Sequence, residues 1–393
     1  MNRVYFDHAA TTKTDPRVLE AMLPFLSETF GNPSSVHDVG QEARAAVEAA
    51  RKRVAGFIGA RPDEIVFTSS GTEADNFAIK GLAAAAQKKG NHIITSSVEH
   101  HAVLHSCKKL EKQGFQVTYL PADGYGMVNP EDVAKAILPS TILISVMHAN
   151  NEVGTIQPIA EISRIARERG IVFHTDAVAT VGSIPVDVNR LGVDLLSLAG
   201  HQFYGPKGIG ALYIRHGVRI APFIDGGIQE NGRRAGTENV PAIVGLAKAV
   251  EVAEQEMGPA AQSCKKLRDT MEAGIKERIQ YVRVNGHPEN RLPGHLSICV
   301  QYIEGESMVL FLNMEGFAAS SGSTCSSKAL KASHVLTAMG VPPDVAQGSL
   351  LFTLGRENRM EDVEYFLKTF PPIVERLREM SPLYGDMKKK KKQ

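Results

Sequence analysis

Between about residues 60 and 215, short runs of β-branched and aliphatic residues alternate with stretches whose apolar residues recur at helical spacing. Consecutive parallel strands need crossovers of a dozen or more residues, usually helices, so this alternation predicts a mainly parallel sheet with helices on its faces. We expect seven strands, at residues 64–68, 92–96, 116–120, 141–147, 171–174, 195–198 and 210–214. Helices are expected at residues 41–58, 72–89 and 159–169.

The remainder of the chain predicts a second, smaller domain. A length of 393 residues is enough for two domains that each bury a core. After Val240 the sequence is strongly helical around residues 247–257, and short apolar runs return at 281–284 and 295–300. We therefore expect a large domain at 13–255, connected by this helix to a small α+β domain made of residues 1–12 and 256–385. Residues 386–393 form a lysine-rich tail, whose repelling charges favour a solvated segment, although a binding role stays open.

The charge and the hydropathy of the chain limit the kinds of partner and the location that we expect. The chain has 44 Lys and Arg residues against 43 Asp and Glu residues, so we expect no nucleic acid and no acidic membrane surface among them. No apolar stretch has the length of a signal peptide near the N-terminus, or of a membrane span of ~18 residues elsewhere, which predicts a soluble, cytoplasmic protein. The 4 cysteines form no CxxC pair, as expected of free thiols in a reducing compartment.

Polar residues follow several predicted strands, at the sheet edge where ligands of open α/β folds bind. Residues 68–73 follow a strand and open a helix, so backbone N–H groups and the hydroxyls of Ser70 and Thr72 suit a phosphate; an ordinary helix N-cap is the alternative. Asp176 suits a cationic ring nitrogen, or else caps the next turn. His100 is suited to stack on a cofactor ring, or is a structural histidine.

The segment at residues 320–327 is rich in small polar residues and carries Cys325. Such surroundings are unusual for a core cysteine and favour an exposed thiol on a flexible loop. An inert surface cysteine is the alternative that the local sequence leaves open.

Nine segments resemble, in order along the chain, those of the NifS/IscS-type (group I) cysteine desulfurases. They are FDHAATT at 6–12, GNPSS at 31–35, FTSSGTEADN at 67–76, VEHHAV at 98–103, HANNEVGTIQPI at 148–159, HTDAV at 174–178, GPKGIGALYIR at 205–215, GTENVP at 236–241 and SGSTCSS at 321–327. The resemblance covers nearly the whole chain. It implies the aspartate-aminotransferase-type fold of enzymes dependent on pyridoxal phosphate (PLP), in which a large domain has a mainly parallel seven-stranded sheet. It also implies a homodimer.

The resemblance further implies a role for each matched residue. In this family a lysine holds PLP as an aldimine, and a loop cysteine takes sulfur from L-cysteine as a persulfide, leaving L-alanine. By position, Asp176 would pair with the ring nitrogen, His100 would stack on the ring and act in catalysis, and Cys325 would accept sulfur. The other implied cofactor-binding residues are Ser70, Gly71 and Thr72 at the phosphate, Asn151 on the ring-oxygen and substrate side, His201 near the phosphate, and Thr237 reaching across a dimer interface. An IscU-type iron–sulfur scaffold protein, together with cysteine or sulfide, completes the implied partners.

Four positions depart from the family pattern. Where the family reads Ser-Gly-His-Lys or Ser-Ala-His-Lys, this chain has Ala199 for the serine and Gln202 for the lysine. Ala179 replaces a glutamine at the ring oxygen, and Leu351 replaces the arginine that holds the substrate carboxylate. Because an amide nitrogen is delocalised, Gln202 cannot form a Schiff base. The two lost neutral hydrogen bonds cost about 1 kcal/mol each, and the lost arginine–carboxylate pair about 1.5–3 kcal/mol.

Three functions stay open. The first is a PLP-dependent cysteine desulfurase of iron–sulfur cluster assembly with impaired catalysis. The second is a non-catalytic member in which Cys325 holds sulfur or co-ligates an iron–sulfur cluster with a scaffold protein, since thiolate is a soft ligand. The third, a different reaction on the same fold, is disfavoured because no replacement lysine is evident. PLP would be bound without a covalent link or be absent, and whether Gln202 is natural or engineered stays open.

Overall fold

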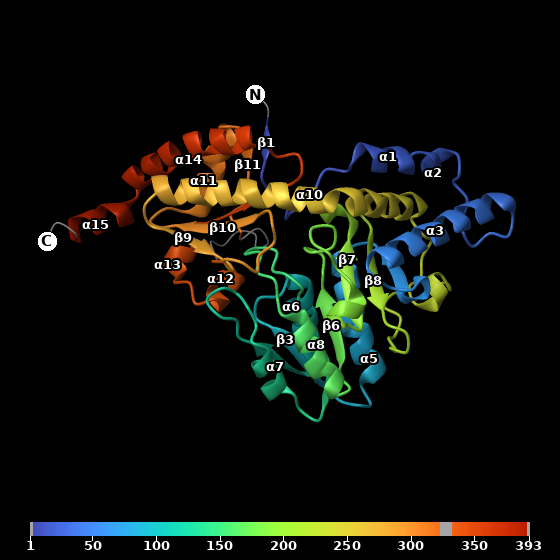
Figure 1. Ribbon diagram of the computed structural model, residues 1–393. Coiled ribbons are helices and arrows are strands. Elements are labelled where there is room, and N and C mark those ends of the chain that lie inside the picture. Colours follow the sequence, from blue (N-terminus) through green and yellow to red (C-terminus); the bar gives the residue numbers. More distant parts are fainter. Residues whose placement is uncertain (1–2, 323–331, 391–393) are drawn as a thin grey trace.

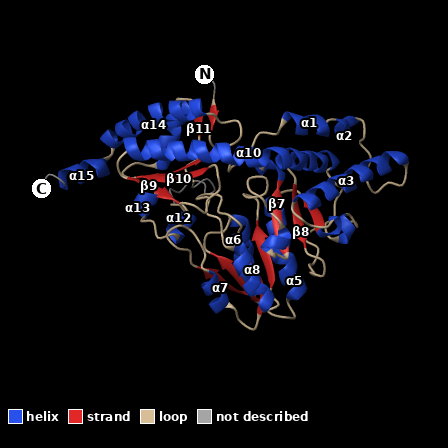
Figure 2. Ribbon diagram, viewed as in Figure 1, coloured by secondary structure: helices blue, strands red, loops and turns tan. Residues whose placement is uncertain are grey.

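The computed structural model of the chain describes residues 3–322 and 332–390. Within these residues one sheet has seven strands in the order β2-β8-β7-β6-β5-β3-β4, drawn in red in Figure 2. They are β2 (Ile65–Thr68), β3 (His92–Ser96), β4 (Gln116–Leu120), β5 (Thr141–Ser145), β6 (Val172–Asp176), β7 (Leu195–Ala199) and β8 (Gly210–Ile214). Strands β3 to β7 are parallel to one another, whereas β8 is antiparallel to both β2 and β7. The prediction of a mainly parallel seven-stranded sheet is confirmed.

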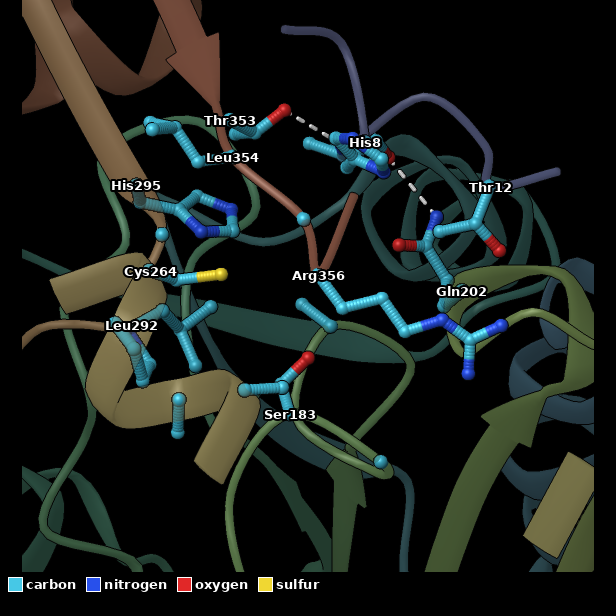
Figure 3. A pocket seen from close by; sticks show the side chains of 18 of the residues that line it. His8, Thr12, Ser183, Gln202, Cys264, Leu292, His295, Thr353, Leu354 and Arg356 are labelled. Atoms are coloured by element: carbon cyan, nitrogen blue, oxygen red, sulfur yellow. Dashed lines mark hydrogen bonds between the residues drawn. The ribbon is translucent and has the colours of Figure 1, made fainter. Parts of the chain in front are cut away.

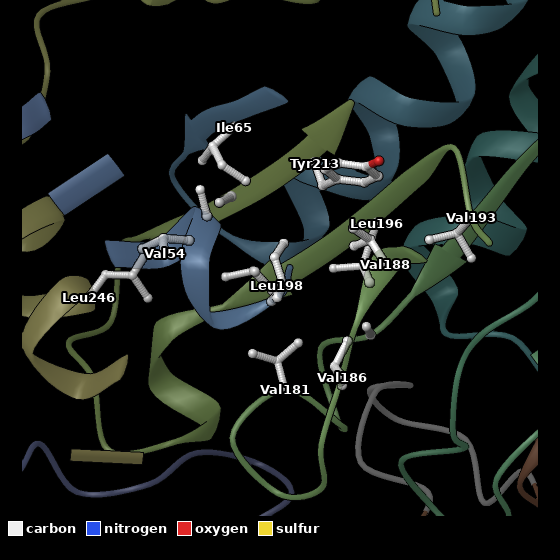
Figure 4. Packing of buried hydrophobic residues seen from close by; sticks show 14 of the residues in the cluster. Val54, Ile65, Val181, Val186, Val188, Val193, Leu196, Leu198, Tyr213 and Leu246 are labelled. Atoms are coloured by element: carbon white, nitrogen blue, oxygen red, sulfur yellow. The ribbon is translucent and has the colours of Figure 1, made fainter. Parts of the chain in front are cut away.

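Helices cover both faces of this sheet, which is why its inner strands are buried along nearly their whole length. Along β7, Leu196 and Leu198 pack into one core cluster together with Val54 of α3 (Asp38–Phe57) and Leu246, as Figure 4 shows. Leu195 faces the opposite cluster. Two helical segments cover that second cluster. The first is a nearly continuous stretch of α4 (Gly71–Asn76), a π-helical turn (Phe77–Gly81) and α5 (Leu82–Ala86). The second is α6 (His101–Glu111).

The connecting helix has 39 residues, which is longer than the roughly 20 residues expected around 247–257. Helix α10 (Val240–Arg278) runs without a break along the top of the molecule in Figure 1, from the seven-stranded sheet to the second, smaller sheet. Its apolar face continues past Pro259 through Cys264, Leu267 and Met271, which belong to the core of the smaller part. The proposed boundary at residue 255 lies inside this helix, so the division into domains stays a prediction.

The smaller part is built on a three-stranded antiparallel sheet, β12 (Ser349–Thr353), β10 (His295–Val300) and β9 (Val282–Asn285). The N-terminal strand β1 (Val4–Tyr5) pairs in parallel with β11 (Phe317–Ala318), and α11 (Gly305–Met314) and α14 (Met360–Met380) complete this part. The other helices are α1 (Pro16–Met22), α2 (Pro24–Ser27), α7 (Pro130–Ala136), α8 (Ile159–Glu168), α9 (Val188–Leu191), α12 (His334–Ala338), α13 (Pro343–Ala346) and α15 (Pro382–Lys390). Among the described residues, no helix combines the length and apolar character that crossing a membrane requires.

A buried ion pair fixes the loop that precedes Thr237. The Arg51 guanidinium donates to both carboxylate oxygens of Glu230, at 2.7 and 2.8 Å, and lies 4.8 Å from the centroid of the Phe67 ring. Glu230 also accepts from the backbone N–H of Phe67 at 2.9 Å. Both charged side chains are buried, and Arg51 also pairs with the exposed Glu48 at 3.3 Å. Glu230 therefore supplies the buried, two-bond share of the compensation for the Arg51 charge.

Glu230→Ala should therefore lower the free energy of unfolding by about 3–5 kcal/mol, because it leaves the buried Arg51 charge with only the exposed Glu48 as a partner. Chemical denaturation of parent and variant measures this loss. The matched control is Glu254→Ala, which breaks the exposed pair with Arg53 and should change stability by less than about 1 kcal/mol. Similar losses in the two variants would contradict the role given to the buried pair.

Candidate functional site

Two carboxylates and an imidazole converge at the carboxyl edge of the large sheet. Asp176 ends β6, Asp75 lies on α4, and His100 immediately precedes α6; one candidate ligand atom from each lies within 4.8 Å of the others. Asp176 also accepts from the backbone N–H of Val178 at 2.9 Å, and His100 Nδ1 accepts from that of Ala102 at 3.1 Å. The structure therefore brings together two residues that the sequence suggested. Asp176 also makes the capping contact that was its alternative, and the contact of His100 with Ala102 is of the kind expected of a structural histidine.

The start of α4 closes one side of this edge. Ser70 caps the helix by accepting from Glu73 N–H at 3.1 Å, and the side chain of Thr72 is exposed. A Cβ atom on Gly71 would lie 2.5 Å from Val178 Cγ2, so only glycine allows the helix to approach the segment after Asp176 so closely. That Cβ position on Gly71 lies 3.5 Å from the methyl group of Ala199. The family's serine hydroxyl would thus have faced the first turn of α4.

Buried acids surround Asp176. Burial raises the pKa of Glu99 to about 8; one carboxyl oxygen accepts from Ser96 Oγ at 2.5 Å and from Met147 N–H at 3.0 Å, and the other has no partner. Burial and the neighbouring Asp176 raise the pKa of Asp75 well above its usual range. Burial likewise raises the pKa of Asp176, opposed by His100. Asp75 and Glu99 lie within two of the matched segments, but no local pattern indicates that they are buried beside Asp176.

Gln202 and Ala179 line a cavity of about 90 Å³ beneath this edge (Figure 3). Gln202 Nε2 donates to the backbone carbonyl of Ala9 at 2.9 Å. The opposite wall includes Cys264 of α10 and His295, whose Nε2 atom is buried without a hydrogen-bond partner. Two of the four altered positions therefore face one enclosed space. Sequence reasoning gave no role to the residues of the far wall, which come from remote parts of the chain.

The other suggested residues are more dispersed. His201 Nδ1 lies 3.3 Å from Thr11 Oγ1, and burial lowers the pKa of His201. Leu351 is buried in β12, where its backbone exchanges hydrogen bonds of 2.7 and 3.3 Å with Ser320; it does not line the cavity. Asn151 is half-buried and Thr237 exposed. Cys325 lies outside the described residues.

Comparison with known proteins agrees with this architecture. Residues 4–366 match the family model of class V aminotransferases. The chain is 56% identical over 380 residues to "Cysteine desulfurase IscS" of Methanosarcina thermophila, covering 97% of this chain and 94% of that protein. It is 55% identical over 389 residues to the protein of that name in Dictyoglomus turgidum, covering 99% of each. A solved structure described as a NifS-like protein superposes with a TM-score of 0.90 at 42% identity, covering 95% of this chain and 100% of that one.

The fold and the matched residues define a class V aminotransferase. Within that class, the chain belongs to the IscS-type cysteine desulfurase family.

The buried acid Glu99 gives a test of this electrostatic environment. Its folded-state pKa of about 8 lies above the ordinary value of 4.5, so between these values only the unfolded chain has lost the proton. The contribution of Glu99 to the free energy of unfolding is therefore fully present at acid pH, and it falls as the pH rises from about 4.5 to about 8. Glu99→Gln does not titrate, so its stability relative to the parent should increase by about 1.4 kcal/mol per pH unit between pH 5 and 7. Urea unfolding of both proteins measures the difference; a difference independent of pH would refute the assignment.

Proposed function

We propose that this protein is a cysteine desulfurase homologue of iron–sulfur cluster assembly whose catalysis is impaired because it cannot anchor its cofactor. The observation that carries the proposal is Gln202, whose amide donates to Ala9 where relatives of this type are expected to have the PLP lysine. We infer a cytoplasmic setting and L-cysteine or sulfide as the sulfur source. An IscU-type scaffold protein would receive the sulfur.

The residues at the sheet edge fit the ring and phosphate of PLP. Asp176 is a buried carboxylate with no ion pair to a lysine or arginine within the described residues, so a protonated ring nitrogen would supply its missing partner. Ser70, Gly71 and Thr72 place the start of a helix where a phosphate would be stabilised. When bound, PLP would supply an electron sink for bonds at the substrate α-carbon.

His100 is the residue best suited to move protons at this edge. Its Nδ1 atom accepts from Ala102 N–H, so in the neutral ring the proton resides on Nε2. The face of the ring, which is perpendicular to that N–H bond, could stack on the cofactor, as the family resemblance implies.

We expect the altered positions to weaken cofactor binding and to slow turnover. Gln202 supplies no amine for covalent attachment, and Ala179 supplies no donor to the ring oxygen. Leu351 would leave the substrate carboxylate without a charged partner, so the sulfur atom would rarely meet Cys325 in the geometry that transfer needs.

The second candidate is a non-catalytic role for Cys325. Three functional side chains and the anchoring lysine are missing, yet the SGSTCSS segment around Cys325 matches the family. A thiolate there could hold sulfur, or co-ligate an iron–sulfur cluster with the scaffold protein. The absorbance of the protein loaded with cluster on its scaffold tests this candidate, because Cys325→Ser should remove the contribution of this chain.

Gln202→Lys should restore covalent binding of PLP but only weak desulfuration, because the carboxylate partner is still missing. Adding Leu351→Arg should raise cysteine-dependent sulfide release by more than the two single changes together, since each supplies a part that the other cannot use alone. The assay compares the parent, both single variants and the double variant.

Cys325→Ser in the double variant is the control, and it should abolish persulfide formation while leaving the absorbance of bound PLP unchanged. If the parent already releases sulfide at the rate of the double variant, the site is not impaired.

We also propose a homodimer. Exposed apolar side chains gather on α1, α2 and the following segment, where Leu23, Leu26 and Phe30 are each more than half exposed. Ile228 and Thr237 lie in or beside the loop held by the buried ion pair, and both are exposed. An uncovered apolar surface of this kind favours a symmetric interface.

Sedimentation at micromolar concentration should therefore give the mass of a dimer, and Leu26→Asp together with Phe30→Asp should shift it toward the monomer, because charges would be buried in the interface. Leu310→Asp, on the exposed face of α11, is the matched control. A monomeric parent would exclude the dimer.

A further inference from the structure

An ion pair joins the start of α4 to the loop that precedes Thr237. The Arg234 guanidinium donates from Nε to Glu73 Oε1 at 2.8 Å and from Nη2 to Glu73 Oε2 at 3.1 Å. Both side chains are largely buried, with 19% of Arg234 and 9% of Glu73 exposed. Two parallel hydrogen bonds of this kind fix the orientation of the partners as well as their separation. The pair therefore ties together two segments that lie 161 positions apart in the sequence.

The carboxylate of this pair is fixed beside the residues proposed to hold the cofactor phosphate. Glu73 Oε2 accepts from the backbone N–H of Ser69 at 2.8 Å and from Ser69 Oγ at 2.5 Å. The backbone N–H of Glu73 donates in turn to Ser70 Oγ at 3.1 Å. A negative charge is thus held next to Ser70 and Gly71, where the phosphate of PLP would bind.

Glu73 stays ionised in these surroundings. Burial raises the pKa of its carboxyl group, but the hydrogen bonds from Arg234 and Ser69 outweigh burial and hold the pKa below its ordinary value. Without Arg234, the Glu73 carboxylate would repel a phosphate bound at the neighbouring residues. Binding of an anion at this edge therefore requires that the charge of Glu73 is compensated.

The loop that carries Arg234 is itself anchored. Gly236 has a φ angle of 106°, in the left-handed region that favours glycine, and its N–H donates to Gln229 Oε1 at 3.1 Å. The buried pair of Arg51 with Glu230 holds the beginning of the same loop. The loop is therefore closed on itself and fixed at its start, so Arg234 leaves it from a defined position.

We infer that Arg234 is a positioning residue for the cofactor phosphate, because it compensates the charge of Glu73 and so permits an anion to bind beside that carboxylate. Arg234 acts through Glu73 rather than by contact with the phosphate. This role rests on the proposed function, which assigns the phosphate to residues 70–72. It adds a determinant of phosphate affinity that lies in the loop before Thr237.

Equilibrium dialysis of the full chain with PLP, and separately with pyridoxal, tests this role. Arg234→Gln should weaken PLP binding by about tenfold or more, because the charge of Glu73 is then uncompensated. The affinity for pyridoxal should change by less than about twofold, because pyridoxal has no phosphate for Glu73 to repel. Arg234→Lys keeps the charge but loses the two parallel bonds, so its PLP affinity should lie between those of the parent and Arg234→Gln.

The double variant Glu73→Gln with Arg234→Gln separates charge from structure. It removes the carboxylate together with its partner, so its PLP affinity should return to within about threefold of the parent. A purely structural role predicts that the double variant binds PLP no better than Arg234→Gln does. Arg164→Gln, which breaks an exposed pair with Glu168, is the control and should bind PLP as the parent does. Circular dichroism checks that each variant folds.

Three outcomes would overturn the role of Arg234. They are unchanged PLP affinity in Arg234→Gln, an equal loss of pyridoxal and PLP affinity in that variant, and no recovery in the double variant; each leaves the proposed function in place. A parent that binds no PLP would overturn the proposed cofactor site together with this role. A parent that releases sulfide efficiently would refute the proposed impairment and leave the role of Arg234 standing.

Discussion

The candidate site depends on a buried carboxylate that has no lysine or arginine to pair with among the described residues. Asp176 is held at the end of β6 by pairing with β5 and β7, where its partner in register is Ser197. Asp75 and Glu99 crowd the same position, and burying several acids together is tolerated only if most of them keep their protons. One positive charge on a ligand would compensate the site. This requirement explains why the edge suits a protonated ring nitrogen.

The proposed loss of functional side chains is compatible with an intact fold, because backbone contacts hold the chain at the positions concerned. Leu351 keeps its place through backbone hydrogen bonds to Ser320 and through β12 pairing with β10. Ala199 ends β7 in the same way, by backbone pairing with Gly210 of β8. Gln202 retains one polar contact, to the carbonyl of Ala9. The ring-binding half of the site and the anchoring half can therefore change independently, as the impaired enzyme proposed here requires.

Local patterns predicted the large sheet well and the long-range features poorly. The strands around Ile94, Leu143 and Leu198 were evident because strands buried on both faces are apolar throughout. Asp176 and His100 were found because they follow such strands. Helix α10 was expected to end early, since Pro259 and polar residues interrupt its pattern, but its apolar face continues into a second core.

The partners of the site could not be predicted because their proximity arises only in the folded chain. Burial of Asp75 and Glu99 depends on helices that converge from different segments, and ionisable residues are rarely buried.

The central claim is that this chain keeps a PLP site without an amine to anchor the cofactor. Incubation with PLP, reduction with borohydride and peptide mapping by mass spectrometry test it directly. The account predicts no phosphopyridoxyl group on residues 199–207 of the parent, and a modified residue 202 in Gln202→Lys. A stoichiometric phosphopyridoxyl group on Lys207 of the parent would contradict it, because the chain would then have a substitute anchor.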